Sequence, residues 1–381
     1  MMMLQFTDPA KLKTKKIVFE DIFTALDPGT LEQLKELSSK RSVIEEKIND
    51  TSSITEAIAR EMYGGLTSQS EQDLHKLKQY LPLLENFIFH VDAICSNRQV
   101  MYWVSNLKIQ WTTAVGGSLS FLNLLGPKYY QVGNIRFELG MILFLYGATL
   151  RDRACEISTE ALVQSATLFR EAAGVYLYLS EEVLPTLQSI DAGKKPPEST
   201  SSVASVMSLI CLAEAQVVTI RRAEERKAAV GLLAKLHHGV SDFLSEAARI
   251  LYSGSGEVKD VSPRLFGYIS SLKCVHELRS QRYLAKDLQA SGQVGVSIGI
   301  LREALNHARE INPGEVTWRL AIKEEMDAVS ELLEKLEREN EFVWHEKVPS
   351  VDQLPLPRGN KIVSAIRYQP LRYERQLIFK I

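Results

Sequence analysis

The sequence lacks the cysteine patterns that build zinc centres and disulfide frameworks. Its four cysteines are scattered roughly sixty residues apart, and none belongs to a CxxC pair or a Cys/His cluster. Isolated thiols of this kind are typical of proteins in a reducing compartment, where a free cysteine packs as a small apolar side chain. We therefore expect no disulfide and no metal, and we expect buried free thiols at Cys95, Cys155, Cys211 and Cys274.

The chain also lacks an excess of either charge and an apolar run long enough to cross a membrane. Its 381 residues include 45 basic and 47 acidic side chains, whereas a nucleic-acid binder usually carries a strong basic excess. The most hydrophobic run, FELGMILFLYGATL at 137–150, is shorter than the roughly 20 residues that a bilayer requires. This composition predicts a globular protein with no nucleic-acid partner, and the run predicts a buried core helix.

Neither end of the sequence shows a targeting signal. The start, MMMLQFTDPAKLKTKK, has no apolar signal core, and the end, RQLIFKI, has no CaaX cysteine. We expect a cytoplasmic chain without signal peptide, transmembrane helix or lipid anchor. Its recruitment to a membrane then depends on partners or on a basic surface.

Catalytic motifs are scarce as well. The sequence contains no HExxH and no Walker-type glycine loop. His237 and His238 are adjacent, so on a helix they point about 100° apart and do not easily share a metal. We therefore expect a protein that is not an enzyme and that has no cofactor and no small-molecule substrate.

One motif points the other way. GVSIG at 295–299 matches the GxSxG motif of serine hydrolases, and Asp327 and His345 follow in the hydrolase order. That motif requires a buried strand before the serine, whereas the preceding residues, YLAKDLQASGQ, predict a helix and a turn. A hydrolase that uses Ser297 is thus a disfavoured alternative, and we expect Ser297 to lie where two helices pack closely.

Helical periodicity dominates the rest of the chain. A helix that ends at Ser291-Gly292 and a second that runs through Leu305 resemble a tetratricopeptide unit, although no clean copies recur at a fixed period. The chain is therefore expected to be a single unit over 1–381, with a helical body at about 15–347 and an extended arm at 348–381. Its other expected elements are a short strand at 15–22, helices at 51–63 and 315–340, and an exposed loop at 190–204.

The stretch LAEAQVVTIRRAEERKAAVGLLAKL at 212–236 does not fit one helix. Leu232 lies thirteen residues beyond Thr219, which is a rotation of about 220°. Two helices with a turn between Arg226 and Gly231, with Gly231 as the breaker, bring Thr219, Leu232 and Leu236 towards one surface.

The same stretch contains a basic cluster interleaved with two glutamates. The plain interpretation is an exposed helical face. The sharper alternative is contact with an acidic partner or a membrane through Arg222, Arg226 and Lys227.

Several stretches of the sequence resemble the Bro-one (BRO) domain family. EFVWHEKVP at 341–349 is similar to the closing signature of that family, and the stretch at 212–236 is similar to its central helix pair. RFELGMILFLYGATLRDRA, EAAGVYLYLSEEVLP and the unit at 282–308 occur in the family's order, so the resemblance covers about 15–370. The AEAQ-VTI form and the short length most resemble the single-domain, Brox-type members.

The resemblance implies an elongated, boomerang-shaped, all-α body with a tetratricopeptide-like core and a small amino-terminal β-sheet. It implies an adaptor in endosomal, multivesicular-body sorting that binds the carboxy-terminal amphipathic helix of an ESCRT-III core subunit, of the charged multivesicular body protein type. The partner-binding positions of the family fall on Leu232, Leu236 and Thr219, and at the last of these Alix-type members have an aromatic residue. Trp344 stands where those members have a tyrosine.

Two alternatives of other classes remain open on the sequence alone. A tetratricopeptide-like scaffold that binds extended, charged peptide ends would share the helical pattern, and the leucines at 232 and 236 would then be ordinary core. The serine hydrolase is the third possibility.

Overall fold

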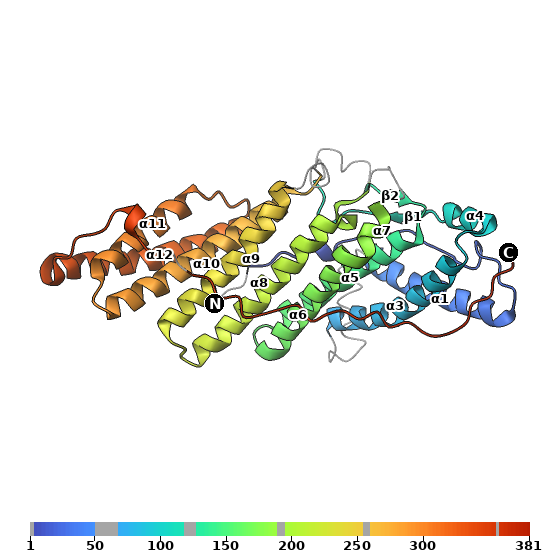
Figure 1. The fold of residues 1–381 in the computed structure, drawn as a ribbon, viewed down its shortest axis with the longest axis horizontal. Coiled ribbons are helices and arrows are strands. Elements are labelled where there is room, and N and C mark those ends of the chain that lie inside the picture. Colours follow the sequence, from blue (N-terminus) through green and yellow to red (C-terminus); the bar gives the residue numbers. More distant parts are fainter. Residues whose placement is uncertain (1–3, 50–67, 118–126, 189–194, 254–259, 356–357) are drawn as a thin grey trace.

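The computed structural model describes residues 4–49, 68–117, 127–188, 195–253, 260–355 and 358–381. They form an elongated, helical molecule, as predicted (Figure 1). Its α-helices are α1 (Pro28–Asn49), α3 (Gln69–Ala93), α4 (Arg98–Asn106), α5 (Ile135–Glu156), α6 (Leu162–Tyr178), α7 (Leu184–Gln188), α8 (Ser201–Glu225), α9 (Val230–Ser253), α10 (Pro263–Ala290), α11 (Val294–Glu310) and α12 (Val316–Glu339).

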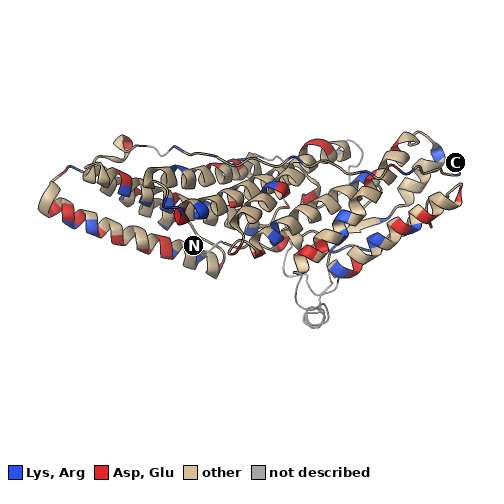
Figure 2. Cartoon of the chain, turned by 90° about the horizontal axis from the view of Figure 1, so that it is seen from below, with Lys and Arg blue, Asp and Glu red and all other residues tan. Residues whose placement is uncertain are grey.

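The helices follow one another along the long axis of a boomerang-shaped body. Helices α1, α3 and α4 form one end, α5, α6, α8 and α9 form the middle, and α10, α11 and α12 form the other end (Figure 1). Acidic and basic side chains are interspersed along the outer helices and do not gather by sign (Figure 2). The balanced charge of the sequence is thus also balanced in space.

Helix α5 is the core helix that the hydrophobic run at 137–150 predicts, because all of these residues are buried. Two of its buried side chains are charged, and each has a partner. Glu138 lies 2.5 Å from Arg41 of α1, and Arg151 lies 2.6 Å from Glu214 of α8. Helix α8 is also apolar and long enough to span a bilayer by composition, but most of it is buried among its neighbours.

The expected strand at 15–22 is wrong. The sheet consists of β1 (Ile109–Trp111) and β2 (Tyr130–Val132), paired antiparallel, and the amino-terminal segment contributes only an isolated bridge from Thr14 to Trp111. The alternation of apolar and polar residues at 15–22 has another cause: Ile17 and Phe19 are both buried, although they do not belong to a sheet. The backbone N–H of Phe19 donates to the Ser38 hydroxyl at 2.8 Å, so α1 supplies the partner that a strand would have supplied.

The expected exposed loop at 190–204 is also wrong in its described part. Residues 197–199 form a buried turn of 3-10 helix, and α8 already begins at Ser201 with Thr200 as its N-cap. Glu198 is fully buried because its carboxylate accepts hydrogen bonds from the backbone N–H groups of Ala114 and Val115 at 2.5 and 2.8 Å. The expected helix at 51–63 lies outside the described residues.

Other expectations are confirmed or adjusted. Helix α10 ends at Ala290, before Gly292, whose φ of 80° only glycine adopts freely, and α11 follows as predicted. Helix α12 continues into a π-helical turn, η5 (Asn340–Trp344). All four cysteines are free, but only Cys211 and Cys274 are buried.

The carboxy-terminal arm is extended, apart from a 3-10 turn, η6 (Val351–Gln353), and it crosses the middle helices to the far end of the molecule (Figure 1). Helical glycines let its backbone approach closely. A Cβ at Gly174 of α6 would overlap the Ile366 carbonyl, and a Cβ at Gly239 of α9 would overlap the Asn360 carbonyl. The arm therefore packs on these helices backbone to backbone.

This packing predicts the effect of one methyl group. Gly174→Ala should displace the arm and lower the free energy of unfolding by about 1–3 kcal/mol, the usual cost of overpacking. Gly314→Ala is the matched control, because a Cβ there meets no atom within 4 Å. Urea unfolding measures both variants, and equal stabilities would contradict the close approach.

Candidate partner-docking surface

The stretch at 212–236 forms two helices, as predicted, but the breaker is a different residue. Helix α8 ends at Glu225, and Lys227 adopts the left-handed conformation with a φ of 54°. The N–H of Ala228 then donates to the Ala223 carbonyl at 3.0 Å, which closes the end of α8. Gly231 lies inside the first turn of α9, where a Cβ would stand 2.7 Å from Asp287 Oδ2.

One side-chain hydrogen bond sets the register of this hairpin. Gln216 Nε2 donates to the Leu236 carbonyl at 2.7 Å. The two helices are antiparallel, so one turn toward their connection leads from Gln216 to Thr219 on α8 and from Leu236 to Leu232 on α9. Thr219 and Leu232 therefore lie at about the same level of the hairpin. The side chain of Leu232 is exposed (42%), whereas Thr219 is half-buried and its hydroxyl donates to the Ala215 carbonyl at 2.8 Å.

Leu236 does not share this exposure, since only 3% of it is accessible, so the expectation that it stands outside is wrong. Leu236 belongs to the hydrophobic core, and the carboxy-terminal arm lies close to the same turn of α9. The Asn360 N–H donates to the Lys235 carbonyl at 2.9 Å, and the Asn360 carbonyl accepts from Gln216 at 2.9 Å. The arm therefore lies against this turn of α9, and the open surface ends at Leu232.

The basic side chains lie at the connection between the two helices. Arg226 and Lys227 are exposed and Arg222 is half-buried, and none of the three forms a side-chain hydrogen bond or ion pair with another described residue. Arg221 differs, because it donates to the Ser158 carbonyl at 3.2 Å and lies 3.8 Å from Glu225. We define the hairpin surface as Thr219, Leu232, Arg222, Arg226 and Lys227.

A buried polar cluster supports the hairpin from beneath. The Tyr283 hydroxyl donates to Glu224 at 2.8 Å, and the Tyr283 ring stacks on His237 with centroids 5.5 Å apart. His237 Nδ1 lies 2.9 Å from His276 Nδ1, while His237 Nε2 lies 3.6 Å from Glu224. Both contacts are favourable when His276 donates from Nδ1 and His237 carries its own proton on Nε2, facing the carboxylate.

Burial lowers the pKa of His237 and lowers the pKa of His276 well below its usual value, and the charge of Arg279 acts in the same direction on both rings. The pKa of Glu224 is also lowered, because the nearby His237 ring and the hydrogen bond from Tyr283 together outweigh its partial burial. The cluster is thus a neutral histidine pair next to a charged carboxylate. We expected no role for His237 from the sequence. The signal that could have identified it is its helical spacing from Leu233 and Val240, which puts a polar ring on the buried face of α9.

The serine-hydrolase geometry is absent from this part of the chain. Ser297 lies within α11, not after a strand, and is fully buried. Its hydroxyl donates to the carbonyls of Ala285 and Gln293 at 3.0 and 2.9 Å, so it joins α10 to α11 as close helix packing predicts. Among the described residues, no group of three or more His, Cys, Asp and Glu side chains is placed to hold a metal.

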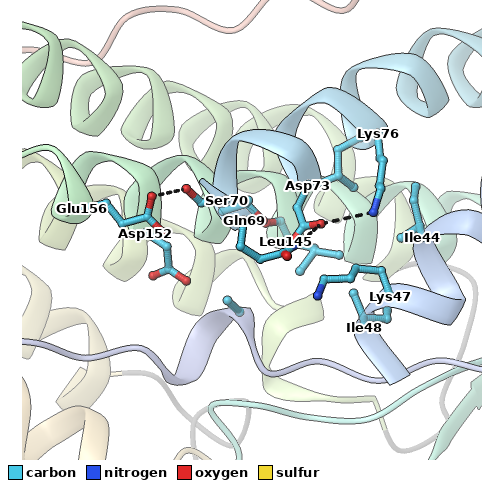
Figure 3. A pocket seen from close by; sticks show the side chains of 13 residues that line it. Ile44, Lys47, Ile48, Gln69, Ser70, Asp73, Lys76, Leu145, Asp152 and Glu156 are labelled. Carbon is cyan, nitrogen blue, oxygen red and sulfur yellow. Dashed lines mark hydrogen bonds and ion pairs between the residues drawn. The ribbon is translucent and has the colours of Figure 1, made fainter. Parts of the chain in front are cut away.

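A separate pocket of about 180 Å³ lies between α1, α3 and α5, and the polar contacts within its lining involve Asp73 and Glu156 (Figure 3). Asp73 lies 3.6 Å from Lys76, and Ser70 donates to Glu156 at 2.5 Å. Burial raises the pKa of Asp152, at one side of the pocket, to about 6. This arrangement stabilises the junction of three helices and presents no catalytic set.

The histidine pair predicts a pH dependence. A histidine whose pKa is lower in the folded than in the unfolded chain destabilises the fold as pH falls below about 6.5, with a slope of up to about 1.4 kcal/mol per pH unit for each proton. The carboxyls of Asp152 and Glu85, with pKa values raised to about 6 and about 7, act in the opposite sense. His276→Gln should therefore lose less stability than the wild type between pH 7.5 and pH 5.5 in urea unfolding. Equal losses would show that the pair does not titrate as described.

Known proteins provide an independent view of the chain. Residues 9–380 match the family model of the BRO1-like domain. The BRO1 domain-containing protein BROX of Homo sapiens is 26% identical over 81% of this chain and 76% of its own length. Programmed cell death 6-interacting protein of Homo sapiens is 23% identical over 74% of this chain and 32% of its own length.

Solved structures share the fold. The structure described as "ALIX BRO1 CHMP4C complex" superposes with a TM-score of 0.67 at 18% identity, covering 96% of both chains. The structure described as "Structure basis for endosomal targeting by the Bro1 domain" has a TM-score of 0.67 at 16% identity, covering 93% of this chain and 91% of its own. The family match over nearly all residues and this shared helical architecture establish that the chain belongs to the BRO1-like domain family.

Proposed function

We propose that this chain is a non-enzymatic adaptor that binds the carboxy-terminal amphipathic helix of an ESCRT-III core subunit and thereby acts in endosomal sorting and membrane remodelling. The observation that carries the proposal is the exposure of Leu232 opposite Thr219 on the hairpin surface. A leucine exposed at the start of a helix, on a surface that two antiparallel helices shape, suits the apolar stripe of a ligand helix.

The charges of the hairpin surface suit the same ligand. Arg222, Arg226 and Lys227 lack partners among the described residues, so they are available to carboxylates that flank an apolar stripe. Exposed charges contribute mainly to orientation and association rate, and salt screens them. The apolar contact at Leu232 therefore supplies affinity, and the cations favour an acidic helix over a basic one.

The relatives support this choice of partner. One of the structures that share the fold of this chain is a BRO1 domain in complex with CHMP4C, a protein of the charged multivesicular body type. Two of the family's three partner-binding positions fall on Thr219 and Leu232, which the register of the hairpin puts at about the same level of α8 and α9. Leu236 is almost inaccessible and packs in the core, so in this proposal it supports the surface from within.

Leu232→Asp should reduce the affinity for a synthetic CHMP4-type tail helix at least tenfold, because it removes an apolar contact and adds a charge that repels an acidic ligand. Leu26→Asp is the matched control, since Leu26 is 60% exposed just before α1, at one end of the molecule, whereas α8 and α9 form its middle (Figure 1). Isothermal calorimetry measures the affinity and circular dichroism checks the fold. A substitution at Leu236 cannot test the proposal, because a buried aspartate destabilises the fold itself.

Thr219→Phe tests the same surface by a gain of affinity. Buried aromatic anchors often contribute about 2 kcal/mol or more to binding. A ring opposite Leu232 should therefore tighten the tail helix about tenfold or more, and Leu232→Asp should cancel that gain. An unchanged dissociation constant for Thr219→Phe would place the ligand elsewhere.

A further inference from the structure

A second groove lies on the α10–α11 hairpin, at the end of the molecule opposite the carboxy terminus (Figure 1). Its volume is about 640 Å³. Two rows of side chains line it at helical spacing, and they come from facing sides of the two helices: Cys274, Leu278 and Gln281 of α10, and Ile300, Ala304 and Ala308 of α11. Each row covers about two helical turns, or roughly 10–12 Å.

The floor of this groove is apolar and its rim is acidic. Leu278 and Ile300 lie in the floor and are almost inaccessible, so the accessible apolar surface comes from side chains at its edge such as Ile311 and Leu354. The carboxylates of Glu277, Glu303 and Glu310 line the groove together with one lysine and two histidines. Lys273 lies 3.4 Å from Glu277 and His307 lies 3.0 Å from Glu303, which leaves Glu310 without a partner among the described residues. The rim therefore favours a ligand that carries positive charge, in contrast to the hairpin surface.

Two polar atoms that line the groove have no partner. Gln281 Oε1 and His238 Nδ1 are buried, and neither forms a hydrogen bond within the described chain. Buried polar atoms in native proteins normally have a partner, and the exceptions call for an explanation. Gln281 Oε1 can only accept, so a ligand that brings an N–H or ammonium donor into the groove would satisfy it.

The arm already places a helical turn next to this groove. Val351, on the turn η6, and Leu354, directly after it, both line it, and a Cβ at Gly299 of α11 would stand 2.7 Å from Leu354 Cδ2. The α10–α11 hairpin thus packs against Leu354 of the arm, while Val351 stays exposed at the edge of the groove. The remaining length of the groove offers the same kind of surface without an occupant from the described chain.

We propose that the α10–α11 groove is a second docking site, for a short amphipathic helix of a partner protein whose small apolar stripe is flanked by lysine or arginine. The stripe lies on Ile311, Leu354 and Val351, the accessible apolar side chains of the lining, and a basic side chain reaches Glu303 or Glu310. This site involves neither Leu232 nor the basic connection of the α8–α9 hairpin. It therefore allows one chain to hold an acidic and a basic helix at the same time.

The probe is a fluorescein-labelled synthetic peptide of about 14 residues, long enough for the groove at about 1.5 Å per residue. It carries Leu and Ala at helical i, i+3, i+4, i+7 spacing and Lys beside that stripe. Fluorescence anisotropy should show saturable binding to the full chain. Glu303→Lys combined with Glu310→Lys should weaken it at least tenfold, whereas Glu331→Lys combined with Glu334→Lys, two exposed positions on α12, should leave it within twofold.

Methyl NMR of isoleucine-labelled protein places the peptide. The methyl groups of Ile300 and Ile311 line the groove and should shift on titration, and Leu232→Asp should leave both the shifts and the affinity unchanged. A scrambled peptide of equal composition should bind at least tenfold more weakly. Equal binding of the scrambled peptide, insensitivity to the charge reversal at Glu303 and Glu310, or loss of binding in Leu232→Asp would each overturn the proposal.

Discussion

The amide of Gln216 fixes the relation between three segments that are far apart in the sequence. Its Nε2 donates to the carbonyls of Leu236 on α9 and Asn360 on the arm, and its Oε1 accepts from the N–H of Ile362 at 3.0 Å. Each polar atom of this nearly inaccessible side chain thus has a partner, which is the condition for burying an amide without a large cost. Because this contact holds the arm against α9, it decides which part of the α8–α9 hairpin a ligand can reach. The surface around Leu232 is what the arm leaves open.

A buried ion pair likewise holds together segments that are far apart in the sequence, and it includes the start of the chain. Arg151 donates to Glu214 at 2.6 and 2.7 Å and also to the Phe6 carbonyl, so α5, α8 and the first described residues share one polar centre. The Tyr268 hydroxyl donates to the same glutamate at 2.6 Å, which brings in α10. Such pairs add little net stability relative to apolar side chains, but breaking one of them is costly. They therefore restrict how the consecutive helices can slide, and that restriction keeps a surface built from two helices in register.

The sequence predicted the helices well and the burial of single residues less well, for an identifiable reason. Helical periodicity is local, so the two helices in 212–236, the core helix at 137–150 and the break before Gly292 could all be predicted. The burial of Leu236 depends on tertiary packing in the core. The arm that lies against the neighbouring Lys235 comes more than a hundred residues later, and an extended arm has no periodicity from which its position could be inferred. The same limit explains the false strand at 15–22, whose alternating apolar residues pack on α1. The sequence contains one local signal for the path of the arm. Glycines such as Gly174 and Gly239 lie inside otherwise apolar helices, at the places where the backbone of the arm approaches closely.

The two candidate docking surfaces carry charges of opposite sign, although the charge of the whole chain is nearly balanced. A nearly neutral protein has no long-range field to select partners, so selectivity has to come from local groups. At the α8–α9 hairpin those groups are cations without partners beside Leu232, and at the α10–α11 groove they are carboxylates around a floor of Leu278 and Ile300. A helix that matches one rim is repelled by the other, and like-charge contact discriminates more strongly than an imperfect apolar fit. An adaptor with this layout can distinguish two amphipathic helices of similar apolar pattern by the sign of their flanks alone.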